Sequence, residues 1–118
     1  MSKINIKATI KQNGKKEEEI EAQALLENNE ITYLYNGITT ILDIKEQKIR
    51  RVTEELELII DFKNELIITD YEECSLDISI KVIKKEIEQN KIKIKYEVID
   101  SKDIFEYEII WRELWKKK

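Results

Sequence analysis

Apolar and polar residues alternate along most of this chain with a period of two. The segment Lys3–Ile10 shows the pattern clearly, because its apolar side chains stand at every second position. Successive side chains of a β-strand point to opposite faces, so the pattern predicts a strand with one buried face. The same alternation predicts further strands over residues 20–24, 31–35, 38–44, 49–53, 56–62, 66–71, 76–82, 92–98 and 105–111.

Tight turns separate these segments. Asn13-Gly14 and Asn36-Gly37 are the strongest hairpin signals, because both residue types tolerate a positive φ. About nine or ten short strands at regular spacing are typical of a sandwich or a barrel. The chain has 118 residues, no proline and no linker. We therefore expect one all-β domain over residues 1–118, folded as a small antiparallel closed β-barrel of about eight to ten strands.

Three segments also fit a helix. Apolar residues recur at helical spacing over residues 49–63 and 107–115, and Lys16–Leu26 is rich in the helix formers Glu, Ala and Leu. Short turns on both sides fit hairpins better, so we interpret all three as strands. A short C-terminal helical turn over Trp111–Lys116 is the one helical element that we allow.

The order of the strands resembles that of the YwiB-like family, small bacterial proteins of unknown function with a calycin-like (lipocalin-like) β-barrel. The resemblance rests on the Lys3–Ile10 strand, the Tyr33-x-Tyr35 strand, Thr39-Thr40 after Asn36-Gly37, and the alternating segment Ile92–Val98. The chain departs from the family at Val52–Glu55, where members carry Arg-x-Gly, and at Tyr71–Cys74, where they carry Thr-Pro-Tyr-Gly. The resemblance implies the barrel and brings no site residue with it.

Charge and hydropathy restrict the partners. Charged residues make up 39% of the chain and the net charge is -4. A nucleic-acid partner is not expected, because phosphate binding needs a basic face. No apolar stretch approaches the ~20 residues of a membrane span, and the start of the chain has no apolar signal region. We expect a cytoplasmic protein with no membrane partner.

Missing residue types exclude most catalytic chemistry. The chain has no histidine, one cysteine and two glycines. Triad catalysis, most zinc sites, dithiol redox chemistry and glycine-rich phosphate loops are therefore ruled out. Acidic residues gather at Asp70, Glu72, Glu73 and Asp77, which we interpret as a solvated face around an unreactive Cys74. We expect neither an enzyme nor a bound cofactor or metal.

Aromatic residues on one face of several strands are the remaining candidates. Tyr33, Tyr35, Tyr96, Tyr107 and Trp111 alternate with polar residues, so a barrel turns them inward. Large side chains with polar tips are suited to a ligand cup, but they also fill barrels that hold no ligand. The function hypothesis is a barrel that binds a small apolar or amphipathic ligand through these five residues. The alternative is a filled structural or protein-interaction module, and either form is a monomer or a homodimer.

Overall fold

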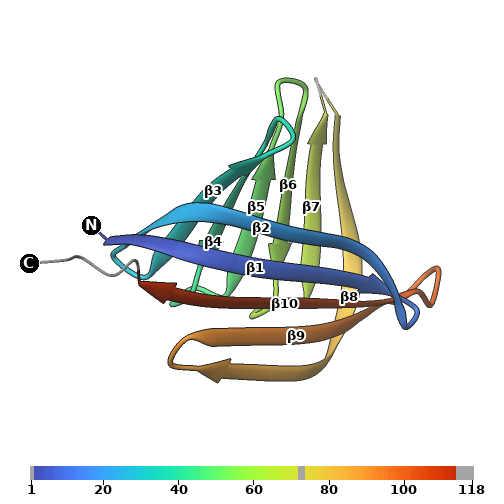
Figure 1. The fold of residues 1–118 in the computed structure, drawn as a ribbon. Coiled ribbons are helices and arrows are strands. Elements are labelled where there is room, and N and C mark those ends of the chain that lie inside the picture. Colours follow the sequence, from blue (N-terminus) through green and yellow to red (C-terminus); the bar gives the residue numbers. More distant parts are fainter. Residues whose placement is uncertain (1, 72–73, 114–118) are drawn as a thin grey trace, which may run out of the picture.

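Ten antiparallel strands form a closed β-barrel in the computed structural model, which describes residues 2–71 and 74–113 (Figure 1). Each strand pairs with its neighbours in sequence, and the first pairs with the last. No helix occurs among the described residues. The strands are β1 Ser2–Gln12, β2 Lys15–Glu27, β3 Glu30–Tyr35, β4 Ile38–Asp43, β5 Lys48–Val52, β6 Leu56–Asp61, β7 Leu66–Tyr71, β8 Cys74–Glu88, β9 Lys91–Val98 and β10 Ile104–Glu113.

The predicted barrel and its strands are confirmed, with two corrections near the C-terminal half. Strand β8 continues to Glu88, six residues beyond the predicted end, because a bulge between Val82 and Lys84 interrupts the alternation. The helical turn expected over Trp111–Lys116 is wrong for its first half. Residues 111–113 extend the ladder between β10 and β1, where Trp111 pairs with Ile6, and residues 114–116 lie outside the described part.

Asn-Gly pairs form the first and third hairpin turns as expected. Asn13 and Gly14 have φ angles of 51° and 84°, and Asn36 and Gly37 have 51° and 75°. Positive φ at both central residues gives the turn the twist that joins antiparallel strands, and few residue types adopt it without strain. These turns therefore fix the register of the strands on either side.

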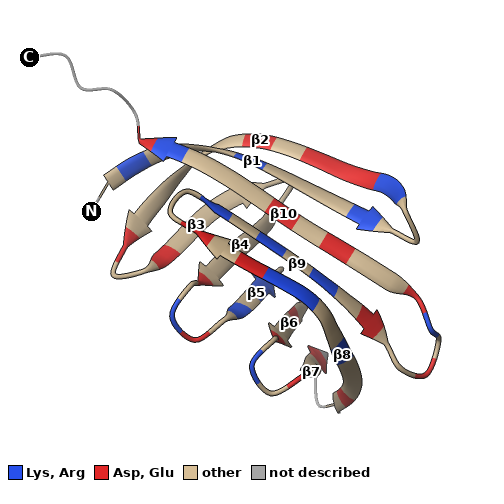
Figure 2. Ribbon diagram, turned by 90° about the horizontal axis from the view of Figure 1, so that it is seen from below, with Lys and Arg blue, Asp and Glu red and all other residues tan. Residues whose placement is uncertain are grey.

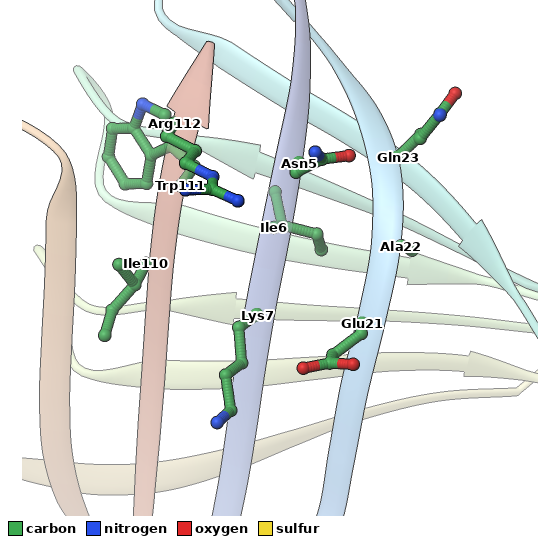
Figure 3. Close-up of a pocket in the computed structure, with 9 residues that line it drawn as sticks. All are labelled: Asn5, Ile6, Lys7, Glu21, Ala22, Gln23, Ile110, Trp111 and Arg112. Carbon is green, nitrogen blue, oxygen red and sulfur yellow. The ribbon is translucent and has the colours of Figure 1, made fainter. Parts of the chain in front are cut away.

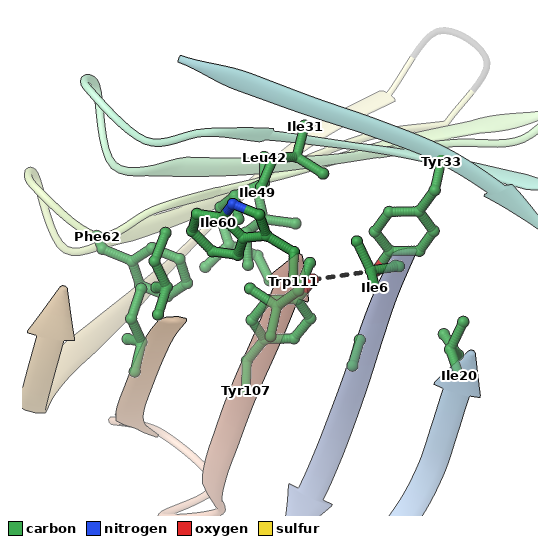
Figure 4. Close-up of a cluster of buried hydrophobic side chains, with 14 of the residues drawn as sticks. Ile6, Ile20, Ile31, Tyr33, Leu42, Ile49, Ile60, Phe62, Tyr107 and Trp111 are labelled. Carbon is green, nitrogen blue, oxygen red and sulfur yellow. Dashed lines mark hydrogen bonds between the residues drawn. The ribbon is translucent and has the colours of Figure 1, made fainter. Parts of the chain in front are cut away.

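Inward apolar side chains fill the half of the barrel nearest the chain termini. Trp111 and Leu42 pack there, and Ile49, Ile60 and Phe62 lie at the inner boundary of this half (Figure 4). On the outer face, Lys and Glu alternate along the strands (Figure 2). Cross-strand ion pairs such as Lys93–Glu106 at 3.3 Å lie on this face. The charges thus decorate the outside while isoleucine and aromatic residues supply the core.

The barrel closes through a narrow seam between β2 and β3. Only Leu25–Glu27 of β2 pair with β3, whereas the β1–β2 ladder runs from Ser2↔Leu26 to Gln12↔Lys15. Figure 1 shows β1, β2, β9 and β10 running together while β3–β7 cross them steeply. Residues 15–24 of β2 have no partner on the β3 side, so the sheet is interrupted toward the end that carries the β1–β2, β3–β4 and β5–β6 turns. We call this end the open half of the barrel.

Candidate functional site

An internal cavity of about 310 Å³ occupies the open half of the barrel. Its lining is mainly apolar and comes from β1, β3–β10 and the residue that follows β6. Three tyrosines, a threonine and an arginine add polar atoms. The lining residues are Ile10, Tyr33, Thr40, Ile49, Arg51, Leu58, Ile60, Phe62, Ile67, Ile78, Tyr96, Val98, Phe105, Glu106 and Tyr107.

Three of the five predicted ligand-binding residues reach this cavity. Tyr33, Tyr96 and Tyr107 line it and are at most 7% exposed. Tyr35 is half-buried against the core and does not line the cavity. Trp111 points inward but packs in the filled half, among Leu42, Ile49 and Ile60 (Figure 4). The structure therefore brings three of the candidates together and places the other two elsewhere in the interior.

Two of the tyrosines are joined across the barrel. The hydroxyl oxygens of Tyr33 on β3 and Tyr107 on β10 lie 3.0 Å apart and share one buried hydrogen bond (dashed in Figure 4). Burial, together with the neighbouring Tyr33 hydroxyl, raises the pKa of Tyr107 well above its usual value. The Tyr107 hydroxyl consequently stays protonated at neutral pH. One of the two protons forms the shared bond, and the other is free to be donated.

Tyr96 stands in an aromatic wall on the side of β9. Its ring is stacked with Phe105 at a centroid distance of 5.5 Å and tilted against Phe62 at 5.6 Å. Burial raises the pKa of Tyr96 to about 12, against a smaller opposing influence of the Arg51 charge. Its hydroxyl forms no hydrogen bond to any residue in the described ranges, so it adds another donor to the cavity.

Arg51 of β5 and Glu18 of β2 are polar residues of the open half that sequence reasoning missed. Arg51 lines the cavity, and its Nη2 atom lies 3.7 Å from Oε1 of Glu18. Both side chains are about one-third exposed, so water screens this ion pair. A signal was present for Arg51, because it stands two positions after the buried Ile49 and therefore on the inward face.

A second hollow lies on the outer surface, over β10, β1 and β2 (Figure 3). It is broad and open to solvent, and its outward side chains are Asn5, Lys7, Glu21, Gln23, Ile110 and Arg112. These polar groups carry mixed charges and spread along three strands. The internal cavity encloses a ligand more completely, and we therefore take it as the candidate site.

The acidic residues near the β7–β8 turn form no site in the described part of the chain. Asp70 pairs with Ser75 and Asp77 pairs with Ile68 in the β7–β8 ladder. Cys74 is an exposed free thiol, and Glu72 and Glu73 lie outside the described residues. No group of three or more His, Cys, Asp or Glu residues that could hold a metal ion occurs within residues 2–71 and 74–113.

Comparison with known proteins identifies no relative of this chain. No family model matches the chain, and neither the curated proteins nor the solved structures contain a significant match. The resemblance to the YwiB-like family therefore stays a prediction. In the described residues, no helix is long and apolar enough to cross a membrane.

Proposed function

We propose that this barrel is a non-enzymatic protein that binds a small amphipathic molecule in its interior cavity. The observation that carries the proposal is the cavity of about 310 Å³ between Tyr33, Tyr96 and Tyr107. The other half of the same barrel is filled by Trp111 and its apolar neighbours. A space left open beside a well-packed core, with polar groups converging on it, is the usual form of a ligand pocket.

Size and lining define the class of ligand. A water molecule takes ~30 Å³ of liquid, so the cavity accommodates about ten non-hydrogen atoms. Ile49, Leu58 and Ile60 offer an apolar wall opposite the tyrosines. We infer a ligand with a short apolar body and a polar end. Longer molecules would extend through the open end of the barrel.

The alternative function is a filled structural or protein-interaction module, and only half of the interior is filled in this way. This alternative is supported by two free strand edges, because residues 15–24 of β2 and 84–88 of β8 each have one partner strand among the described residues. Both edges carry mostly Lys and Glu, which normally prevent edge-to-edge pairing. The cavity therefore favours ligand binding, and whether the protein is a monomer or a homodimer stays open.

A cytoplasmic location and a calycin-like fold belong to the same proposal. The exposed, unpaired thiol of Cys74 supports the location, because such thiols persist in a reducing compartment. The closed antiparallel barrel is compatible with a small calycin-like fold.

Native mass spectrometry tests the proposed function with a cavity-filling variant. Leu58→Trp places a large ring in the cavity, and Ile59→Trp adds the same ring one residue away on the opposite face of β6. We expect wild type and Ile59→Trp, purified gently from a cell extract, to carry an extra mass that unfolding releases. Leu58→Trp should lack it. The bare chain mass in all three proteins, together with no uptake of added amphipathic molecules, would contradict the proposal.

A further inference from the structure

Building on the proposed function, we infer that the ligand carries a carboxylate at its polar end and that the Arg51 guanidinium binds it. Arg51 is the single cation in the lining of the cavity, and the tyrosine hydroxyls of the same wall leave O–H donors free. A carboxylate bound by Arg51 goes beyond amphipathic binding, because it fixes the charge of the ligand and its direction in the barrel.

The tyrosine hydroxyls leave two O–H donors free on the cavity wall. Tyr33 and Tyr107 share one hydrogen bond, so one O–H donor is left whichever hydroxyl donates. The Tyr96 hydroxyl supplies another donor that no described residue engages. Burial raises the pKa of Tyr96 and of Tyr107, so both keep their protons in neutral solution. A carboxylate accepts several hydrogen bonds and can engage both of these donors, and the Arg51 charge is what favours it over a neutral group.

Arg51 is the one cation among the residues that line the cavity. It lines the same cavity as Tyr96 and Tyr107. Glu106 contributes no opposing charge inside, because its carboxylate pairs with Lys93 on the outer face. A guanidinium binds a carboxylate through two parallel hydrogen bonds, a geometry that a neutral alcohol cannot reproduce.

Glu18 is the natural competitor for Arg51, and it is easily displaced. It does not line the cavity, its distance of 3.7 Å is long for an ion pair, and about a third of its side chain meets solvent. Water screens partly exposed ion pairs of this kind, so they contribute little to stability. Glu18 also lies on the part of β2 that pairs with β1 but not with β3, so its carboxylate can turn into water when a ligand arrives.

The experiment compares octanoate with 1-nonanol, two probes of about ten non-hydrogen atoms that fit the cavity. Isothermal titration calorimetry measures the affinity of each probe for wild type, Arg51→Gln, Glu18→Gln and Arg50→Gln. Arg50 is the matched control, because it is the adjacent arginine on the outer face and pairs there with Glu57 at 2.7 Å. Circular dichroism confirms that each variant is folded.

Wild type should bind octanoate on the order of tenfold more tightly than 1-nonanol, as expected for one charge-assisted contact. Arg51→Gln should abolish this preference and leave 1-nonanol binding unchanged. Glu18→Gln should strengthen octanoate binding, and Arg50→Gln should behave as wild type.

The carboxylate inference and the proposed function fail on different results. Equal binding of both probes by wild type would overturn the carboxylate assignment and leave the binding function in place. A preference for octanoate that Arg51→Gln retains would also overturn it. If neither wild type nor Leu58→Trp bound either probe, the proposed function itself would be refuted.

Discussion

Removal of the hydroxyl pair between Tyr33 and Tyr107 tests how the two walls of the barrel are joined. The bond connects β3 and β10, which are not neighbours in the sheet, and both residues are at most 7% exposed. Three variants complete a double-mutant cycle: Tyr33→Phe, Tyr107→Phe and the double substitution. Phenylalanine keeps the ring and removes only the hydroxyl, so packing changes little.

The structure sets the size of the expected effects. Each single variant loses one hydrogen bond of ~1 kcal/mol and leaves a buried hydroxyl without its partner, a penalty of roughly 1–3 kcal/mol in a dry interior. Because both residues border the cavity, water can reach the remaining hydroxyl. We therefore expect each single variant to lose about 1 kcal/mol of unfolding free energy. The double variant has no orphaned hydroxyl and should lose little more than either single one.

Urea unfolding followed by far-ultraviolet circular dichroism measures all four proteins, with equal m-values as the check on two-state behaviour. The cycle should give a coupling energy of about 1 kcal/mol between the two hydroxyls. Additive losses, with a coupling within ~0.5 kcal/mol of zero, would show that the hydroxyls act independently in solution. The reasoning from the 3.0 Å bond would then be refuted.

Two further predictions concern pH and a turn. Burial raises the pKa of Tyr96 to about 12 in the folded protein, against about 10 in the unfolded chain. The protonated hydroxyl therefore stabilises the fold fully below pH 10, and this contribution is lost as the pH rises through 12. Tyr96→Phe should show a shallower loss of Tm between pH 10 and 12. Burial alone would raise the pKa of Asp61, but hydrogen bonds from Asn64 and Lys63 lower it overall. Asp61→Ala should therefore cost roughly 1–3 kcal/mol in urea at pH 7, and the difference from wild type should shrink as pH falls below 4.

The strands could be predicted because their signal is the geometry itself. A side chain at every second position is buried, so the alternation of Lys3–Ile10 is the burial pattern of β1. The signal fails where geometry departs from period two. Ile83 is the extra residue of the β8 bulge, and past it the inward register shifts by one, so residues 83–88 no longer look like a continuation of the strand.

The site could be predicted only in part, because alternation gives the face of a residue but not its depth along the barrel. Tyr107 and Trp111 share a face of β10, yet one lines the cavity and the other packs in the filled half. Their depth depends on the stagger of the strands, which no local pattern reveals. Arg51 was missed for another reason, since a charged residue is normally assigned to the surface even at an inward position.

The cavity follows from the width of the barrel and the residues available to fill it. Eight strands enclose a space that side chains just fill, and ten strands enclose a wider one. In the filled half, Trp111 occupies that extra width. Toward the open end the wall carries the smaller residues Thr40 and Ile78, and β2 diverges from β3, so space remains. The same divergence leaves Glu18 without a partner on the β3 side, opposite Arg51, so the one cation of the cavity lining lies beside the entrance. Entrance, cavity and cation thus share a single structural cause.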